Sequence, residues 1–207
     1  SFEPVTTAML ENSKQILDVV WNHRWEYDKG PKLLLSLAQA ILAQRLPIRL
    51  HVVGQQFRSS PAEFKKIAAL LEQHAAALAI DQGSFGFVEN REGYISLLRH
   101  CDVVLSTAEH DFQGLAIQEA CTLRCTPLVP DALVYPEYID SEFLYPFNES
   151  SGDEANCAGI LKHLQDWQSM LTKNIALPRV TLDGFSQKTL RPKYAELLER
   201  LFEEQVR

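Results

Sequence analysis

Two acidic side chains and a glycine follow a short apolar run in the middle of the chain. Seven residues separate Asp111 from Glu119, and Gly114 lies between them. The apolar run reads as a strand and the residues after Gly114 as a helix, so Asp111 falls on the loop and Glu119 about one turn into the helix. An ionised carboxylate only accepts hydrogen bonds, and the amides that begin a helix bind phosphate. Together they predict half of a site for a nucleotide sugar, which is a polyol attached to phosphate.

A second group of candidate residues lies much earlier in the sequence. Arg24 and Lys29 stand just before a predicted helix, and two cations at a helix N-terminus are suited to a diphosphate. In a group-transfer reaction they would stabilise the negative charge that builds on a departing nucleotide diphosphate. The alternative is that Arg24 and Lys29 pair with Glu26 and Asp28 on a solvated turn. The same sheet edge is expected to hold this loop and Asp111, which favours the functional interpretation.

Aromatic and apolar residues follow another predicted strand. Phe85, Phe87 and Val88 stand at its end and could sandwich a nucleotide base. The alternative is that they are core residues, and for Phe85 and Phe87 we expect the core.

Metal binding is the alternative for the loop that carries Asp111. Glu109 and His110 precede it, but three adjacent loop residues rarely all point one way, so no metal is expected. The chain also has no G-x-G-x-x-G after the first strand and no serine elbow with triad partners. Four cysteines show neither a C-x-x-C pair nor zinc-type histidine spacing, and we expect buried thiols. They are Cys101, Cys121, Cys125 and Cys157.

Composition limits the broad class of the protein. The chain has 207 residues, of which 46% are hydrophobic, which is enough for one well-packed domain. A net charge of −7 argues against a general nucleic-acid surface, although a local basic patch could exist. No apolar run is long enough to cross a bilayer, no signal peptide is evident, and free thiols suit a reducing compartment, so we expect a cytoplasmic protein. The first residue is Ser1, which suggests a fragment or a processed form.

Strands alternate with helices of ten or more residues along the chain. This alternation predicts an α/β fold, a Rossmann-like parallel sheet flanked by helices. Residues 1–14 are expected to be a lead-in, and 15–207 a nucleotide-sugar-binding domain that includes the C-terminal helices. Strands are predicted at 14–21, 49–53, 85–88, 103–105 and 127–130. Helices are predicted at 31–45, from 60–61 onward, at 91–100, after 114, at 153–173 and at 186–205.

Two motifs in this order resemble the C-terminal half of family 4 glycosyltransferases. The first loop of that family typically reads G-R-L-x-x-x-K-G, and residues 23–30 here read HRWEYDKG. A later element typically reads E-G-F-G-L-P-x-x-E-A, and residues 111–120 here read DFQGLAIQEA. The wording WNHRWEYDKGP, with EHDFQGLAIQEA and LVYPEYI, is most similar to the tRNA-queuosine mannosyltransferase-like subgroup. The likeness covers nearly the whole chain.

The resemblance implies one half of a two-domain GT-B fold that transfers a hexose with retention, without a metal, from a nucleotide-diphosphate sugar. Arg24 and Lys29 would contact the diphosphate, Asp111 and the following backbone the sugar, and Glu119 the ribose. The main chain near Phe87 would recognise the base. Implied catalytic residues are Arg24, Lys29, Asp111 and Glu119. Implied donor-binding residues are Arg24, Lys29, Phe87, Val88, Asp111, Phe112, Gln113, Gly114, Leu115, Ala116 and Glu119.

For the subgroup, the resemblance implies GDP-mannose as donor and queuosine in tRNA as acceptor. The N-terminal acceptor half is missing, so this chain alone is expected to bind a donor but barely turn over. tRNA is expected to be bound only through the full-length protein, with any RNA contact in the missing half. Asp111 stands where the family usually has Glu, and His23 and Arg124 stand where it usually has Gly. A non-catalytic nucleotide-sugar-binding or scaffold module is the alternative. A nucleotide-sugar epimerase or phosphorylase would need a base or a pyridoxal lysine that the sequence does not reveal.

Overall fold

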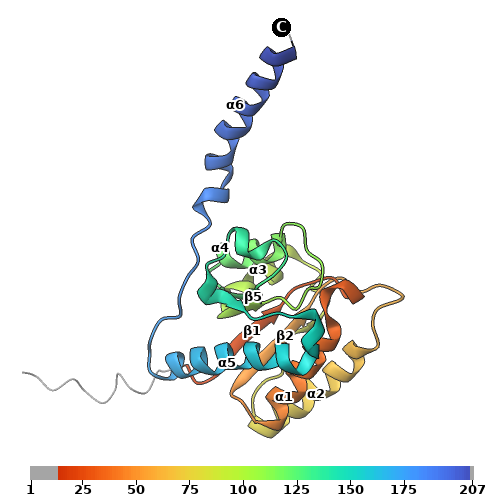
Figure 1. Ribbon diagram of the computed structural model, residues 1–207. Helices are drawn as coiled ribbons and strands as arrows, with labels where there is room; N and C mark the ends of the chain where they lie inside the picture. The colour runs from red at the N-terminus through yellow and green to blue at the C-terminus, as the bar shows by residue number, and fades with distance from the viewer. Residues whose placement is uncertain (1–13, 206–207) are drawn as a thin grey trace, which may run out of the picture.

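Six parallel strands form the central sheet in this computed structural model, which describes residues 14–205 (Figure 1). Their spatial order is β3–β2–β1–β4–β5–β6, and every neighbouring pair is parallel. The predicted Rossmann-like sheet is therefore confirmed. The strand order reverses between β1 and β4, which makes this the switch point where open α/β sheets bind ligands. The strands are β1 (Leu17–Trp21), β2 (Ile48–Val53), β3 (Phe85–Gly86), β4 (Val103–Leu105), β5 (Thr126–Pro130) and β6 (Leu144–Tyr145).

Helices cover both faces of this sheet. α1 packs against both α2 and α5 on one face, while α3 and α4 lie on the other (Figure 1). None of the helices within residues 14–205 is long and apolar enough to cross a membrane. The helices are α1 (Pro31–Ala43), α2 (Glu63–Leu78), α3 (Arg91–His100), α4 (Leu115–Thr122), α5 (Gly152–Thr172) and α6 (Gln187–Gln205).

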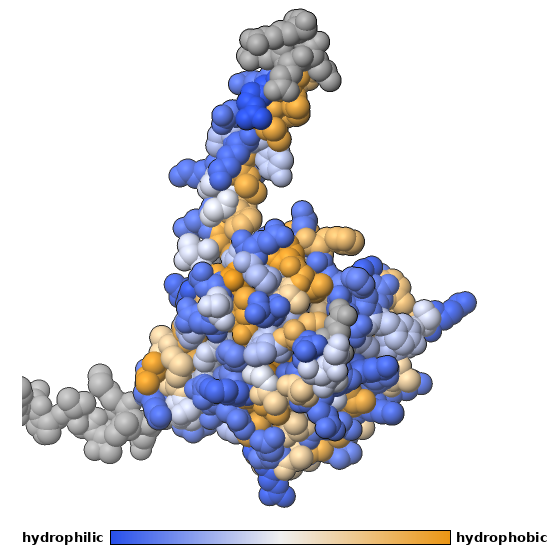
Figure 2. All heavy atoms as spheres, viewed as in Figure 1, coloured by the Kyte–Doolittle hydropathy of each residue, from blue (hydrophilic) through white to orange (hydrophobic). Residues whose placement is uncertain are grey.

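The last helix differs from the others in its surroundings. α6 extends away from the body of the domain, and Figure 2 shows an apolar stripe along it. The stripe is formed by exposed Tyr194, Leu197, Leu198, Leu201 and Phe202.

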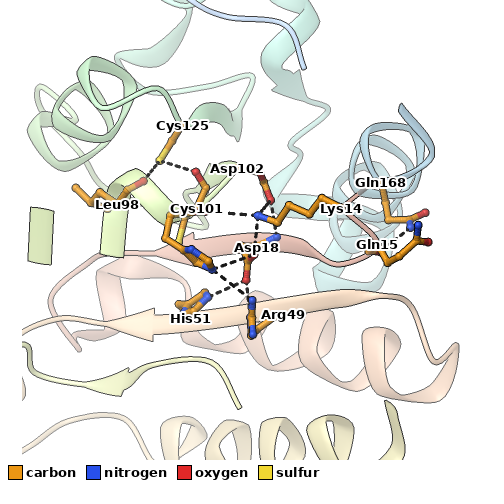
Figure 3. A network of polar contacts seen from close by, with 11 residues as sticks. Lys14, Gln15, Asp18, Arg49, His51, Leu98, Cys101, Asp102, Cys125 and Gln168 are labelled. Carbon is orange, nitrogen blue, oxygen red and sulfur yellow. Dashed lines mark hydrogen bonds and ion pairs between the residues drawn. The ribbon is translucent and has the colours of Figure 1, made fainter. Parts of the chain in front are cut away.

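A buried carboxylate joins β1 to β2 at the amino-terminal ends of the strands. Asp18 in β1 accepts hydrogen bonds from Arg49 Nε at 2.5 Å and is 3.2 Å from His51 Nε2, both from β2. Lys14 Nζ lies 2.7 Å from both Asp18 and Asp102, and all these side chains point toward one another (Figure 3). Burial alone would raise the pKa of Asp18, but the hydrogen bonds from His51, Arg49 and Lys14 hold it well below its usual value. The network therefore keeps this carboxylate ionised inside the sheet.

The first strand is shorter than the predicted 14–21. Pairing with β2 starts at Leu17, whose N–H donates to the Pro47 carbonyl at 3.0 Å. Lys14 lies before the strand, and its ammonium binds the carboxylates just described.

The second helix begins at Glu63 rather than at 60–61. Ser60 instead closes a turn, in which its hydroxyl donates to the Phe57 carbonyl and accepts from the Phe57 N–H. The proline that follows Ser60 disfavours helical backbone at that serine, so the helix starts later.

The two outermost strands, β3 and β6, differ most from the strands predicted from the sequence. β3 ends at Gly86, where a φ of +106° turns the chain, so residues 87–88 leave the sheet. Phe87 is 61% exposed, and the expectation that it belongs to the core is wrong. Phe85 is half-buried and packs edge-on against Trp25 at 4.9 Å between ring centroids. β6 was not predicted, because two residues are too short to show an alternating pattern.

The cysteines are all free thiols. Three of them are buried as expected, whereas Cys121 is only half-buried because it lies on a helix face that reaches the surface.

The loop after β1 is braced on the loop after β4. The Trp21 indole N–H donates to the Thr107 hydroxyl at 2.9 Å, and that hydroxyl donates to the Lys29 carbonyl at 2.8 Å. Gly30 has a φ of +64°, and a Cβ added there would lie 1.9 Å from the Thr107 carbonyl oxygen. Only glycine allows this approach, because the backbone conformation is left-handed and no side-chain atom fits.

Further hydrogen bonds fix the two loops in one register. The Asp28 carbonyl accepts from the N–H groups of Glu109 and His110 at 2.9 and 3.1 Å. Lys29 Nζ donates to the His110 carbonyl at 2.5 Å. Residues far apart in sequence are thus held together at the switch point between β1 and β4.

The Gly30→Ala substitution is expected to destabilise the domain by about 3 kcal/mol, because a Cβ meets backbone at a left-handed φ. Urea unfolding measures this free energy. Gly184→Ala is the matched control, since nothing lies within 4 Å of its added Cβ, and it should change stability by less than about 0.5 kcal/mol. Equal unfolding midpoints for the two variants would contradict the brace.

Candidate functional site

A cleft runs along the carboxyl ends of the strands around the switch point. It consists of two adjoining cavities of about 370 and 350 Å³, which share Asn22, His23 and Arg24 from the loop after β1. The β3-side cavity also includes the ends of β2 and β3 and the start of α3, and the β4-side cavity includes the loop that leads into α4. The cleft therefore occupies the place where this fold class binds ligands.

Both predicted cations line the β4-side cavity. Arg24 lies 2.9 Å from the Glu26 carboxylate, and Lys29 Nζ lies 3.2 Å from the Asp28 carboxylate, so the ion pairs of the alternative interpretation are present. The Arg24 pair is largely exposed and is therefore weak enough to be redirected by a ligand. The buried Lys29 ammonium has three N–H donors, of which the His110 carbonyl and Asp28 account for two. One donor is left for a ligand.

Asp111 combines a structural contact with a position in the β4-side cavity. Its Oδ1 accepts from the Gly114 N–H at 3.1 Å, and its Oδ2 accepts from the Tyr135 hydroxyl at 3.0 Å. The carboxylate thus caps the turn that begins α4, and its remaining lone pairs can accept from a ligand. The first amides of α4 have no acceptor within the helix and lie beside it, which suits an anion.

The remaining predicted residues divide between the cavities. Phe87 and Val88 line the β3-side cavity, and the whole of 111–116 lines the β4-side cavity, including the highly exposed Phe112, Gln113 and Leu115. Within residues 14–205 no three His, Cys, Asp or Glu side chains lie where they could hold a metal ion.

Glu119 is set back from both cavities. It forms an ion pair with Arg91 and a hydrogen bond with the Tyr94 hydroxyl, and these two partners line the β3-side cavity. Burial is the main cause that raises the pKa of Tyr94 to about 12, so this hydroxyl keeps its proton and donates it. Glu119 therefore reaches the cleft only through Arg91 and Tyr94.

Asn22 was missed by the sequence reasoning. Its Nδ2 donates to the Tyr94 hydroxyl at 3.0 Å and to the Ala116 carbonyl at 3.1 Å, which joins α3 to α4 across the end of β1. Its Oδ1 is buried and has no hydrogen-bond partner among the described residues. Its position directly after the first strand was the signal that could have identified it.

His23 was noted in the sequence only as a replacement of glycine. The side chain is 5% exposed, packs edge-on against Trp21, and lines both cavities. Its Nε2 has no hydrogen-bond partner among residues 14–205. Burial lowers the pKa of His23 to about 4, with a further contribution from the Lys29 ammonium, so the ring is neutral at pH 7. A neutral ring with an unpaired nitrogen can bind a polar ligand group.

The buried His23 predicts an acid-sensitive stability. Its pKa is lower in the folded chain than the usual 6.5, so below pH 6.5 the unfolded chain binds a proton that the folded chain does not. The free energy of unfolding keeps its full value with respect to this histidine above pH 6.5, and it falls by about 2 kcal/mol between pH 6.5 and pH 5. Urea unfolding across this range should show a shallower decline for His23→Gln than for the unmodified chain. Parallel pH curves would show that His23 does not titrate as proposed.

Comparisons with known proteins agree with this geometry. The family described as Glycosyl transferases group 1 matches residues 11–171. The tRNA-queuosine alpha-mannosyltransferase of Drosophila melanogaster is 30% identical over 188 residues, which are 90% of this chain and 46% of that protein. The chain thus spans about half the length of this relative.

Solved structures show the same fold. The C-terminal domain of the glycosyl transferase group 1 protein LpcC from Francisella tularensis is 22% identical, with a TM-score of 0.55 over 80% of this chain and 88% of that one. A mutant of S. aureus TarM, crystallised in complex with ligands that include UDP, is 16% identical, with a TM-score of 0.59 over 90% of this chain and 36% of that one. Because the family match covers most of the sequence, the chain belongs to the group 1 glycosyl transferases.

Proposed function

We propose that the chain is the donor-binding half of a retaining family 4 glycosyltransferase with a two-domain GT-B fold. GDP-mannose is the proposed donor, and queuosine in tRNA is the proposed acceptor of the full-length protein. The name of the Drosophila relative states this acceptor and mannose as the sugar, and supports these two parts of the proposal. The free thiols suit the reducing cytoplasm as its proposed compartment.

The observation that carries the proposal is a pair of buried polar atoms without partners at the switch point. Asn22 Oδ1 and His23 Nε2 lie side by side in sequence and line the cleft, and neither has a hydrogen-bond partner among the described residues. A buried polar atom left unpaired costs about 1–3 kcal/mol. A ligand that pairs with both would recover this cost, and cations and helix amides beside them favour a phosphorylated one.

The two cavities suit the two ends of a nucleotide sugar. In the β4-side cavity, Arg24, Lys29 and the first amides of α4 would bind the diphosphate, while Asp111 accepts hydrogen bonds from sugar hydroxyls. In the β3-side cavity, Phe87 and the main chain of Val88 would bind the base. Both cavities of the cleft would therefore hold parts of a single donor molecule.

The same residues would act on the transfer step. When the bond from the anomeric carbon to the phosphate oxygen breaks, the electron pair leaves with the nucleotide diphosphate, an acceptor hydroxyl oxygen bonds to the anomeric carbon, and its proton passes to the leaving diphosphate oxygen. Arg24 and Lys29 would stabilise the charge on that leaving oxygen, an effect worth about 3 kcal/mol for one well-placed donor. The acceptor and its positioning residues belong to the part of the protein outside this chain.

Glu119 requires a rearrangement before it can bind ribose. Its carboxylate is paired with Arg91 in the described structure. The Arg91 side chain is 69% exposed, so this pair costs little to open. Ribose hydroxyls would then replace the guanidinium as donors to Glu119, with Tyr94 keeping the carboxylate in place.

Donor binding to this chain is the direct test. GDP-mannose at millimolar concentration should raise the melting temperature, and Arg24→Ala or Lys29→Ala should weaken its Kd about 10- to 100-fold, since each removes a charge-assisted hydrogen bond. Calorimetry measures the Kd. Lys65→Ala is the matched control, because it removes an exposed cation of α2 outside the cleft and should leave the Kd unchanged.

A donor panel separates the base from the sugar. UDP-glucose and ADP-glucose should bind more weakly than GDP-mannose under the same conditions. If none of these nucleotide sugars shifts the melting temperature, the donor site is wrongly placed.

A further inference from the structure

A separate basic cavity lies at the amino-terminal ends of the strands, on the opposite side of the sheet from the cleft at their carboxyl ends. It has a volume of about 540 Å³ and is formed where α3 ends, β4 begins, α4 turns into β5 and the chain leaves α5. Arg99, His100, Arg124 and Arg179 line it, and all four side chains are exposed. We call this the rear cavity.

Its arginines have no acidic partners. Within residues 14–205, no carboxylate forms an ion pair with Arg99, Arg124 or Arg179, and none of these guanidiniums donates a side-chain hydrogen bond. The one acidic residue that lines the cavity, Asp102, is bound by Lys14 at 2.7 Å (Figure 3). In a chain with a net charge of −7, three unpaired arginines around one cavity form a local positive site.

The negative C-terminal ends of nearby helices do not cancel this positive charge. α3, α4 and α5 all end near the cavity, and each helix C-terminus carries about half a negative charge. Three such ends amount to less than the three positive charges of the guanidiniums. Net positive charge therefore remains for a ligand.

Arg124 lies at the turn that joins α4 to β5. Its φ is +79°, a left-handed conformation in which glycine is unstrained and a side chain is not. The N–H groups of Arg124 and Cys125 donate to the Cys121 and Ala120 carbonyls, both at 3.0 Å, and close the end of α4 in this conformation. Within residues 14–205 the exposed Arg124 guanidinium forms no ion pair, so the turn presents it to the cavity free for a ligand.

We propose that the rear cavity binds phosphate groups of the RNA backbone. The inference rests on the proposed function, in which the acceptor is an RNA. Exposed arginines around an open cavity suit backbone phosphates, which are recognised by charge and position rather than by enclosure. The cavity lies at the opposite end of the strands from the cleft, so it would hold a part of the tRNA distant from the nucleoside that receives the sugar. It would give this half of the protein an RNA contact despite the overall negative charge.

Salt-dependent tRNA binding to this chain tests the proposal. A variant with Arg99→Gln, Arg124→Gln and Arg179→Gln should bind a tRNA mixture at least tenfold more weakly at 50 mM salt. The slope of log K against log salt concentration should fall in magnitude by about two to three, because up to three phosphate contacts are lost. The control carries Arg58→Gln, Lys65→Gln and Lys66→Gln, which remove the same charge from exposed positions outside the cavity. It should keep most of the affinity and of the slope.

The single substitution Arg124→Gly separates binding from folding. Glycine suits the φ of +79°, so the melting temperature should stay the same or rise while tRNA affinity falls several-fold. A fall in melting temperature with unchanged tRNA affinity would overturn the proposal, because Arg124 would then be structural.

Two further arms complete the test. Inorganic phosphate at millimolar concentration should neither stabilise the chain nor displace tRNA, and stabilisation by phosphate without tRNA binding would assign the cavity to a free anion instead. Equal tRNA affinities for the rear-cavity and control variants would likewise overturn the proposal. GDP-mannose calorimetry on the rear-cavity variant should match the unmodified chain, which shows that the variant is folded. Absence of donor binding in the unmodified chain would count against the proposed function and not against the rear cavity.

Discussion

The close approach of the loop after β1 to the loop after β4 is the constraint on which the cleft depends. Gly30 lets the backbone come against the Thr107 carbonyl, and hydrogen bonds from Trp21 and Lys29 hold the two loops in that position. Because the strand order reverses between β1 and β4, α1 and α4 lie on opposite faces of the sheet, which leaves a crevice between the two loops. The brace places a lysine from one loop and the first turn of α4 from the other around the same cavity. Neither loop alone contains a site.

Much of this arrangement could be predicted from the sequence. Apolar runs at 17–21 and 103–105 become buried strands because parallel strands are covered on both faces. A proline at position 31 begins α1, and an acidic residue just ahead of Gly114 caps the turn into α4. Loops after parallel strands share one edge of the sheet, so the meeting of Arg24 with Asp111 at one cavity followed from topology.

Other features depended on contacts that no spacing reveals. β6 is two residues long, and Phe87 leaves the sheet because Gly86 turns the backbone. The unpaired nitrogen of His23 results from the burial of its ring beside Trp21, and the Arg91–Glu119 pair joins two different helices. These are properties of the tertiary structure, and sequence patterns carry little information on them.

The charge distribution gives the two ends of the strands different chemistry. At the cleft, each cation has an acidic neighbour, which keeps it in place until a ligand redirects it. At the rear cavity, three arginines form no ion pair with the carboxylates of the described residues. Cations that are held by acidic neighbours suit one small nucleotide-sugar donor. Exposed arginines without acidic partners suit the repeated phosphates of an RNA backbone.

Hydrogen exchange with and without GDP-mannose tests most directly whether the braced loops form the donor site. We predict that amides in 22–30, 87–91 and 111–117 gain protection together when the donor binds, while those in 122–126 at the opposite end of the strands do not change. Protection confined to one loop, or a gain in 122–126 instead, would contradict a donor held between the loops after β1 and β4.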